Sequence, residues 1–312
     1  MAKLITPFED IDLNPEDFQE SKSIVEESHC VTERGIWFLF YKEIRHNKKA
    51  MICMMILFVV VFASLMAPLS PYDPDSIDVS QVFASPSTSH WFGSDELGRD
   101  SFTRILYGGR VSLAVGIASM IVSVGVGIIV GVVSGYLGGK IDSVCMRIVD
   151  IMQSVPSLLM IIVLFSFIPN NMMTLVIMLS LFSWTNVARI VRAETLTLKE
   201  RDFVIIAETM GVSKVCIICR HVIPNMLSQI IVAASLSIAG AILDESALSF
   251  LGYGVALPQA SWGSMLQNAQ QYILYKPLLA FIPGAFILVT VLCLNVLGDT
   301  LQHTLNPHLR MK

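Results

Sequence analysis

Residues 111–135 have the sequence VSLAVGIASMIVSVGVGIIVGVVSG, and this stretch decides the fold class of the chain. Its central part, Ile117 to Val133, contains no charged residue and several glycines. A helix that crosses a bilayer needs roughly 20 mostly apolar residues, whereas a buried helix of a soluble protein has apolar runs of about 10–14 residues. The stretch therefore predicts a transmembrane helix and not the interior of a large soluble protein.

Other stretches of the chain have the same apolar character. The six predicted spans are residues 50–67, 111–135, 154–168, 172–190, 227–248 and 278–298. Hydrophobic residues make up 54% of the 312 residues and charged residues only 15%, which is outside the usual range of soluble domains. The predicted fold class is therefore all-α, a polytopic membrane protein with six transmembrane helices.

The span at 111–135 is predicted to pack closely against another helix. Its glycines, separated by Ala and Ser, let a second backbone approach. They are Gly116, Gly125, Gly127, Gly131 and Gly135. A span that faces only lipid would favour Leu and Phe instead.

The distribution of Lys and Arg predicts the orientation of the chain. If the N-terminus is cytoplasmic, 17 of the 21 basic residues fall on the cytoplasmic side, and the two long outer loops, 68–110 and 251–277, carry only 4. Cytoplasmic loops of membrane proteins carry such an excess. Both termini are therefore expected in the cytoplasm. The first span begins too far from Met1 for a signal peptide and is expected to be an anchor.

The expected organisation has five parts. They are an acidic disordered N-terminal tail (1–33), an N-terminal anchor with the first transmembrane helix (34–68), an extracytoplasmic loop (69–110), a core domain (111–300) with a cytoplasmic loop at 191–225, and a cytoplasmic C-terminal tail (301–312). The N-terminal tail holds nine acids and two lysines with few aromatic residues, a composition typical of disorder.

A helix is predicted to begin at Ser94 in the outer loop. Ser94 can serve as its N-cap, and Asp95 and Glu96 would face the positive end of the helix dipole. The apolar residues that would share one side are Leu97, Phe102, Ile105 and Leu106. This helix is predicted to lie along the outer membrane surface.

The cytoplasmic loop 191–225 contains a short amphipathic helix that does not span the membrane. Asp202 can cap it, and Gly211 can end it. Its apolar residues fall at i, i+3, i+4 and i+7, and they are Phe203, Ile206, Ala207 and Met210. Such a stripe must be covered, either by the chain's own helices or by a groove in a partner. The periodicity leaves both interpretations open.

Residues 203–225, FVIIAETMGVSKVCIICRHVIPN, resemble the cytoplasmic signature loop of bacterial ABC-importer permeases. The positions that match the family pattern are Ala207, Gly211, His221, Ile223 and Pro224. The resemblance implies that the helix is a coupling helix, which docks into a cleft of a separate ATPase subunit. Ile205 and Ile206 stand where the family usually has Glu and Ala. Ile205 therefore forgoes a capping-box hydrogen bond and adds apolar surface.

Three other segments are similar to the C-type permease subunits of dipeptide, oligopeptide and nickel importers. They are HWFGSDELGRDSFTRILYGGRVSL (90–113), LDESALSFLGYGVALPQASWGSML (243–266) and NVLGDTLQHTLNPHLR (295–310). The resemblance covers residues 36–310 and implies a type I ABC importer permease fold in a bacterial inner membrane. It implies transport by alternating access, with dipeptides, oligopeptides, glutathione-like peptides and nickel chelates as open alternatives for the substrate.

The resemblance also implies the partners of the chain. These are a homologous second permease subunit, two ATPase subunits that bind ATP and Mg, an extracytoplasmic substrate-binding protein and the lipid membrane. No nucleic acid and no cofactor bound by this chain are expected. Two alternatives from other classes are an ion-gradient secondary transporter, which predicts broken helices or ion ligands near the midplane, and a scaffold protein that transports nothing.

The turn after the fifth span is expected at the outer face. Gly252 and Gly254 permit a sharp turn, and Trp262 can sit at the membrane interface. This segment, together with Glu245, is expected to line the mouth that receives substrate.

Few acids fall inside the predicted spans. Asp244 and Glu245 lie near the outer end of the fifth span, and Asp299 lies near the inner end of the sixth. Glu245 is either a functional group or a helix-end acid bonded to neighbouring backbone. No proton relay is predicted, and a route without strong fixed charge suits substrates with varied side chains.

Two apparent motifs are not expected to carry chemistry. Cys216 and Cys219 with His221 lack the second ligand pair of a closed zinc site, so no metal site is predicted. Gly139-Lys140 is followed by Ile and lacks the upstream Gly of a phosphate-binding loop. The chain is therefore not expected to be an enzyme, and ATP hydrolysis is expected in the partner subunits.

Overall fold

The computed structural model describes residue 45, residues 47–255 and residues 258–305. The regular elements in these ranges are helices. The long ones are α3 (Lys48–Leu65), α4 (Ser101–Leu137), α5 (Gly139–Gln153), α7 (Met172–Lys199), α11 (Leu227–Phe250) and α13 (Leu278–Leu305). The short ones are α6 (Ser157–Phe165), α8 (Asp202–Thr209), α9 (Lys214–Ile217), the π-helix η3 (Ile218–Val222), α10 (Ile223–Asn225), α12 (Trp262–Ala269) and the turns η1 (Ala67–Leu69), η2 (Val79–Gln81) and η4 (Gln270–Tyr272). The predicted tail 1–33 lies outside the described residues.

Five helices are long and apolar enough to cross a membrane: α3, α4, α7, α11 and α13. The pair α5 and α6 is bent by 76° and makes a sixth span if both helices are counted together. The prediction placed a span at 154–168 and residues 136–153 on the cytoplasmic side. The structure differs, because residues 154–168 contain only the nine-residue helix α6, and α5 directly precedes it. Pro156 lacks an N–H and disfavours a helical conformation at Val155, so the helix breaks there.

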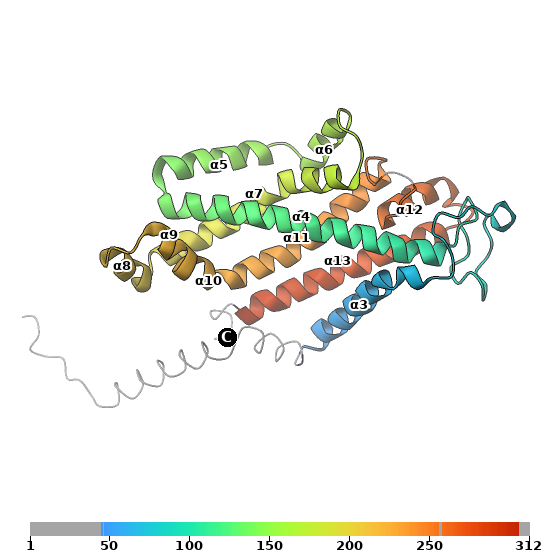
Figure 1. Ribbon diagram of the computed structural model, residues 1–312, viewed down its shortest axis with the longest axis horizontal. Coiled ribbons are helices and arrows are strands. Elements are labelled where there is room, and N and C mark those ends of the chain that lie inside the picture. The colour runs from blue at the N-terminus through green and yellow to red at the C-terminus, as the bar shows by residue number, and fades with distance from the viewer. Residues whose placement is uncertain (1–44, 46, 256–257, 306–312) are drawn as a thin grey trace, which may run out of the picture.

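The long helices lie side by side along the length of the molecule (Figure 1). Helix α4 packs against α7 and α11, and α13 packs against α11 and α3. Helices α8, α9 and α10 lie at one end of this bundle, and the loop that precedes α4 lies with α12 at the other end (Figure 1). We call these the α8 end and the α12 end.

The glycines of α4 allow the close packing that the sequence predicted. A Cβ atom added at Gly131 would lie 2.7 Å from both the carbonyl oxygen of Ala188 and Cβ of Val191 on α7. Similar contacts surround Gly116, Gly127 and Gly135. Gly125 is the exception, because a Cβ atom there would meet nothing within 4 Å.

We expect Gly131→Ala to destabilise the isolated chain and Gly125→Ala to leave its stability unchanged or slightly higher. The added methyl at Gly131 forces α4 and α7 apart, and overpacking of this kind costs about 1–3 kcal/mol. The measurement is the apparent Tm of each purified variant in detergent. Equal Tm values for the two variants would contradict the packing described here.

Helix α4 begins at Ser101 and not at Ser94, so the prediction of a separate surface helix is wrong. Asp100 is the N-cap, and its carboxylate accepts hydrogen bonds from the backbone N–H and the hydroxyl of Thr103 at 2.8 and 2.7 Å. Gly98 has φ +76°, and a Cβ atom there would overlap the backbone of Asp78. This left-handed residue interrupts any helix from Ser94, and the span then runs uninterrupted for 37 residues.

Candidate functional site

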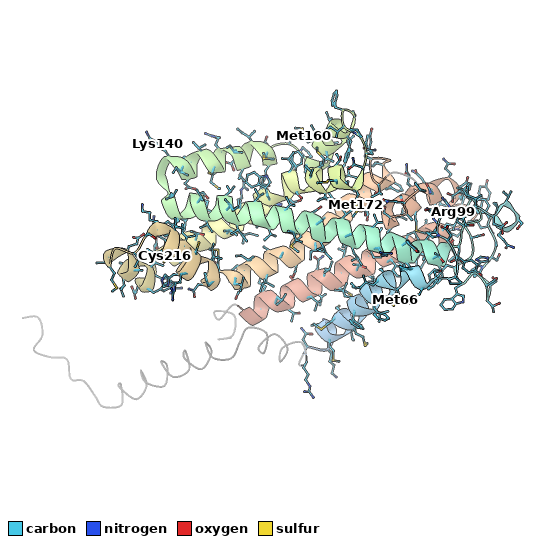
Figure 2. The ribbon with its side chains drawn as sticks, viewed as in Figure 1. Met66, Arg99, Lys140, Met160, Met172 and Cys216 are labelled. Carbon is cyan, nitrogen blue, oxygen red and sulfur yellow. The ribbon has the colours of Figure 1, made fainter. Side chains whose placement is uncertain are left out.

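Helix α8, the predicted coupling helix, lies at the same end of the bundle as Cys216 and at the opposite end from Arg99 (Figures 1 and 2). Its N-cap is Arg201, and no side chain caps it. Asp202 is therefore the first helical residue and not the predicted cap, although its carboxylate still lies at the positive end of the helix dipole.

Gly211 ends α8, as the sequence predicted. Its φ is +77°, its N–H donates to the carbonyl of Glu208 at 3.0 Å, and the N–H of Val212 donates to the carbonyl of Ala207 at 3.1 Å. These two hydrogen bonds form a Schellman motif, for which glycine is the favoured residue. The chain therefore turns sharply after two helical turns.

The two faces of α8 have different surroundings. Val204 and Ala207 are buried in a cluster with residues of α4 and α7, including Val132, Val191 and Leu198. On the outward face, Ile205, Ile206 and Met210 are 49%, 58% and 78% exposed.

The prediction of a single apolar stripe is thus wrong in one respect, because Ala207 belongs to the inward face. The outward face consists of Phe203, Ile206 and Met210 from the predicted stripe, together with Ile205. Val204 was missed in the sequence. Its spacing of three from Ala207 is the signal of a second apolar face.

One side-chain hydrogen bond joins α8 to α4, and a second joins α4 to α7. The Tyr136 hydroxyl at the end of α4 donates to the Glu208 carboxylate of α8 at 2.7 Å. The Lys199 ammonium at the end of α7 donates to the Tyr136 carbonyl at 2.8 Å. Together with the buried inward face, these bonds join α8 to α4 and α7 as one body. No pattern in the sequence indicated that Glu208, Tyr136 and Lys199 would form these hydrogen bonds.

His221 and Pro224 lie in the segment that returns the chain from α8 to α11. The His221 ring centroid lies 6.5 Å from that of Phe203, so the two residues are neighbours. Pro224 occupies the first turn of α10, where its missing N–H costs no hydrogen bond. The structure therefore places the predicted coupling residues together at the α8 end, where Ala207 faces inward and is buried.

Glu245 lies at the α12 end, fully buried in α11, among serine hydroxyls. The Ser249 hydroxyl donates to it at 2.7 Å, and the Ser112 hydroxyl of α4 donates at 3.0 Å. Ser112 also accepts the backbone N–H of Trp262 at 3.3 Å. Glu245 is thus bonded to side chains, and not to backbone as one interpretation of the sequence expected. This cluster joins α4, α11 and α12.

Trp262 is fully buried, so its predicted position at the membrane interface is wrong. Its indole N–H donates to the Ile105 carbonyl at 3.0 Å. Gly252 has φ +91° and ends α11 with a second Schellman motif, and Gly254 packs directly on Ser249. Of the four predicted mouth residues only Gly252 is exposed, and the other three are buried.

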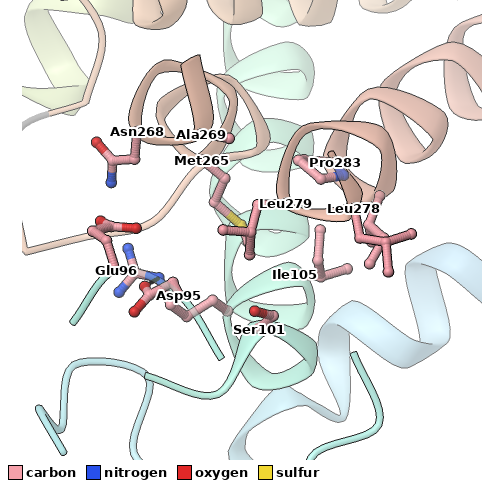
Figure 3. Close-up of a pocket in the computed structure, with 12 residues that line it drawn as sticks. Asp95, Glu96, Ser101, Ile105, Met265, Asn268, Ala269, Leu278, Leu279 and Pro283 are labelled. Carbon is pink, nitrogen blue, oxygen red and sulfur yellow. Dashed lines mark ion pairs between the residues drawn. The ribbon is translucent and has the colours of Figure 1, made fainter. Parts of the chain in front are cut away.

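A charged cluster lies beside this joint, at the base of the loop that precedes α4 (Figure 3). Arg99 forms ion pairs with Asp95 at 2.7 Å and with Glu96 at 2.9 Å, and Arg104 lies 3.5 Å from Asp95. Asp95, Glu96 and Arg104 border a small pocket of about 20 Å³ between α4, α12 and α13. That volume admits a single water molecule. The ion pairs of the cluster fix the base of the loop. The pocket beside them is too small to hold a substrate.

No group of three or more His, Cys, Asp or Glu side chains that could hold a metal ion occurs in residues 47–255 and 258–305. Cys216 and Cys219 are exposed and unpaired with each other.

Two protein families match parts of this chain. The family described as binding-protein-dependent transport system inner membrane component matches residues 127–311. The family described as the N-terminal TM domain of oligopeptide transport permease C matches residues 35–86.

Several transport permeases are similar over nearly the whole chain. The oligopeptide transport system permease protein OppC of Bacillus subtilis (strain 168) is 38% identical over 88% of this chain and 91% of its own length. OppC of Escherichia coli (strain K12) is 41% identical over 89% of this chain and 93% of its own length. The dipeptide transport system permease protein DppC of Bacillus subtilis (strain 168) is 38% identical over 96% of this chain and 92% of its own length.

Among solved structures, a chain of the MetNI methionine ABC transporter in an inward-facing conformation superposes with a TM-score of 0.55. The alignment covers 65% of this chain and 96% of that chain at 17% identity. At this identity the likeness concerns the fold alone, and it confirms the predicted fold class.

Proposed function

Because this chain belongs to the family of binding-protein-dependent transport system inner membrane components, we propose that it is the channel-forming permease subunit of an ATP-driven importer of oligopeptides or dipeptides. It is a multi-pass inner-membrane protein. The proposed substrate class follows the names of its relatives, which transport oligopeptides and dipeptides. The proposed assembly has a homologous second permease, two ATPase subunits and an extracytoplasmic binding protein.

The exposed apolar residues on the outward face of α8 are the main support for this proposal. Ile205, Ile206 and Met210 are exposed on a helix that is too short to span a membrane and that ends the bundle. Isolated apolar residues are normal on a surface, but three neighbouring ones on a fixed helix favour a docking site. We propose that a cleft of an ATPase subunit covers them.

The contacts of α8 support a simple mechanism of coupling. When the ATPase subunits close on ATP, a displacement of α8 passes to α4 and α7 through the buried Val204 and Ala207 and through the Glu208–Tyr136–Lys199 bonds. Packed cores transmit strain because their interiors are dense and hard to compress. The spans then move as bodies, and the route opens alternately to each side. The α8 end is proposed to face the cytoplasm, as do both termini.

The bent pair α5 and α6 is a feature that the secondary-transporter alternative predicts, since such transporters use broken helices. Membership of the transport-system family favours the ATP-driven mechanism instead. A scaffold that transports nothing would leave the outward face of α8 without a partner.

The test is uptake by the complete complex in proteoliposomes, with its ATPase subunits inside and its binding protein outside. We expect uptake of a labelled oligopeptide or dipeptide that needs both ATP and the binding protein. Glutathione and a nickel chelate serve as alternative substrates in the same assay. Uptake that follows an ion gradient without ATP would overturn the proposal, and ATP-dependent uptake of only the nickel chelate would overturn the peptide assignment.

A further inference from the structure

A polar pocket lies where the bend between α5 and α6 faces α7 and α11. Its volume is about 350 Å³. Its lining is Met152, Gln153, Val155, Pro156, Ser157, Ile161, Leu179, Phe182, Ser183, Thr185, Asn186 and Asp244. This size falls in the range of small-ligand pockets and fits the end of a peptide better than a whole oligopeptide.

The polar wall of the pocket is organised by Gln153. Its side-chain amide donates to the Thr185 hydroxyl at 3.0 Å and to the Asn186 side-chain oxygen at 2.9 Å. These bonds fix the end of α5 against α7. Irregular backbone at membrane depth is tolerated where protein buries it or where it lines a water-filled cavity. The break at residues 154–156 is therefore accommodated by this pocket.

Asp244 stands on α11 opposite this wall, and its carboxylate is unpaired. It makes no hydrogen bond or ion pair with any described residue, and its side chain is only partly buried. The lining contains no Lys, Arg or His. Arg189, one turn beyond Asn186 on α7, is already paired with Asp150 at 2.6 Å. The charge of Asp244 is therefore free for a ligand.

The helix ends at the pocket do not cancel this charge. The C-terminal end of α5 and the N-terminal end of α6 meet there, and their partial charges of about half a unit have opposite signs. The full negative charge of Asp244 consequently sets the sign of the pocket. An unpaired acid facing lipid is costly, so a position on a wet route is favoured.

We propose that this pocket is a substrate-binding site along the transport route, in which Asp244 binds a cationic group of the substrate, the free terminal ammonium group of a peptide. The proposal rests on the peptide-importer function above. It replaces the expectation, drawn from the sequence, of a route without strong fixed charge. Gln153 and Asn186 would supply hydrogen-bonding groups for the adjacent peptide unit.

The first test measures the sign of the pocket directly. Ser183, which lines the pocket, is replaced by Cys in a chain whose own cysteines are replaced by Ser, and the complete complex is treated with 2-aminoethyl or 2-sulfonatoethyl methanethiosulfonate. Each rate is normalised to that of the same reagent with a free thiol. We expect the cationic reagent to react at least tenfold faster than the anionic one. Asp244→Asn should reduce the ratio to about one, and Asp244→Glu should keep it. Equal normalised rates with Asp244 present, or no reaction with either reagent, would overturn the proposal.

The second test measures transport by the same complex without the added cysteine. We expect Asp244→Asn to slow uptake of a peptide with a free amino terminus at least fivefold, and Asp244→Glu to restore most of the rate. Uptake by Asp244→Asn at the wild-type rate would overturn the role of Asp244. If the wild-type complex takes up no peptide, the proposed function fails, whereas the labelling ratio still reports on the pocket itself.

Discussion

Replacement of Ile206 by Asp is expected to abolish capture of an ATPase subunit and ATP-driven uptake while leaving the isolated chain folded. Ile206 is 58% exposed on the outward face of α8, so a carboxylate there meets water in the isolated subunit. In the proposed docked state the same carboxylate would be buried against an apolar cleft. Central apolar anchors of interfaces contribute about 2 kcal/mol or more, which corresponds to roughly 30-fold weaker binding.

The measurement is co-purification of the ATPase subunit from detergent-solubilised membranes, followed by uptake in proteoliposomes. Ile206→Leu keeps the apolar area and should keep both activities. The neighbouring Ala207→Asp is a contrasting variant, because Ala207 is only 8% exposed and points into the cluster around Val191. It should lower the apparent Tm of the isolated chain itself. Normal capture by Ile206→Asp would remove the basis of the coupling-helix proposal.

Replacement of Glu245 by Ala is expected to lower the stability of the chain by about 2–4 kcal/mol, the cost of a cavity combined with lost buried hydrogen bonds. The substitution leaves the hydroxyls of Ser112 and Ser249 without their acceptor and leaves an empty space between α4, α11 and α12. The apparent Tm should fall, and α12 should exchange its backbone amide hydrogens faster.

Glu245→Gln is the matched control, because it keeps the shape and one acceptor oxygen. Serine hydroxyls can both donate and accept, so the amide can be accommodated at a cost below about 1 kcal/mol. A fall in Tm with Ala but not with Gln would show that Glu245 acts through shape and hydrogen bonding. If the Ala variant is as stable as the wild type, the serine cluster does not hold this end of the bundle together.

The apolar spans and the C-terminal ends of helices at glycine are the features that local sequence predicts well. An apolar run such as 111–135 has only one stable environment, and a glycine such as Gly211 permits a left-handed residue where other residues are strained. The start of α4 was predicted wrongly because Ser94 and Asp100 are both good caps, and the choice between them depends on Gly98 fitting against Asp78, a contact across 20 positions.

The candidate site likewise has some features that the sequence predicts and others that only the packing decides. The sequence located α8 and its apolar residues, but periodicity over eight residues could not tell Ala207, which the bundle covers, from Ile206, which it leaves exposed. Asp244 and Glu245 are adjacent in sequence and equally acidic. Only the packing gives Glu245 the hydroxyl of Ser112, 133 positions away, and leaves Asp244 unpaired in a pocket.

The sequence by itself determined that the chain has helices able to cross a membrane, where the short helix α8 lies between two of them, and where α8 ends. These properties follow from short-range physics, the apolar length needed to cross a bilayer and the backbone freedom of glycine. Only the tertiary structure decided which face of α8 is free, what Glu245 binds, and that the bend after α5 opens a pocket beside Asp244. Those properties depend on side chains that meet across distant parts of the chain, and no local pattern encodes them.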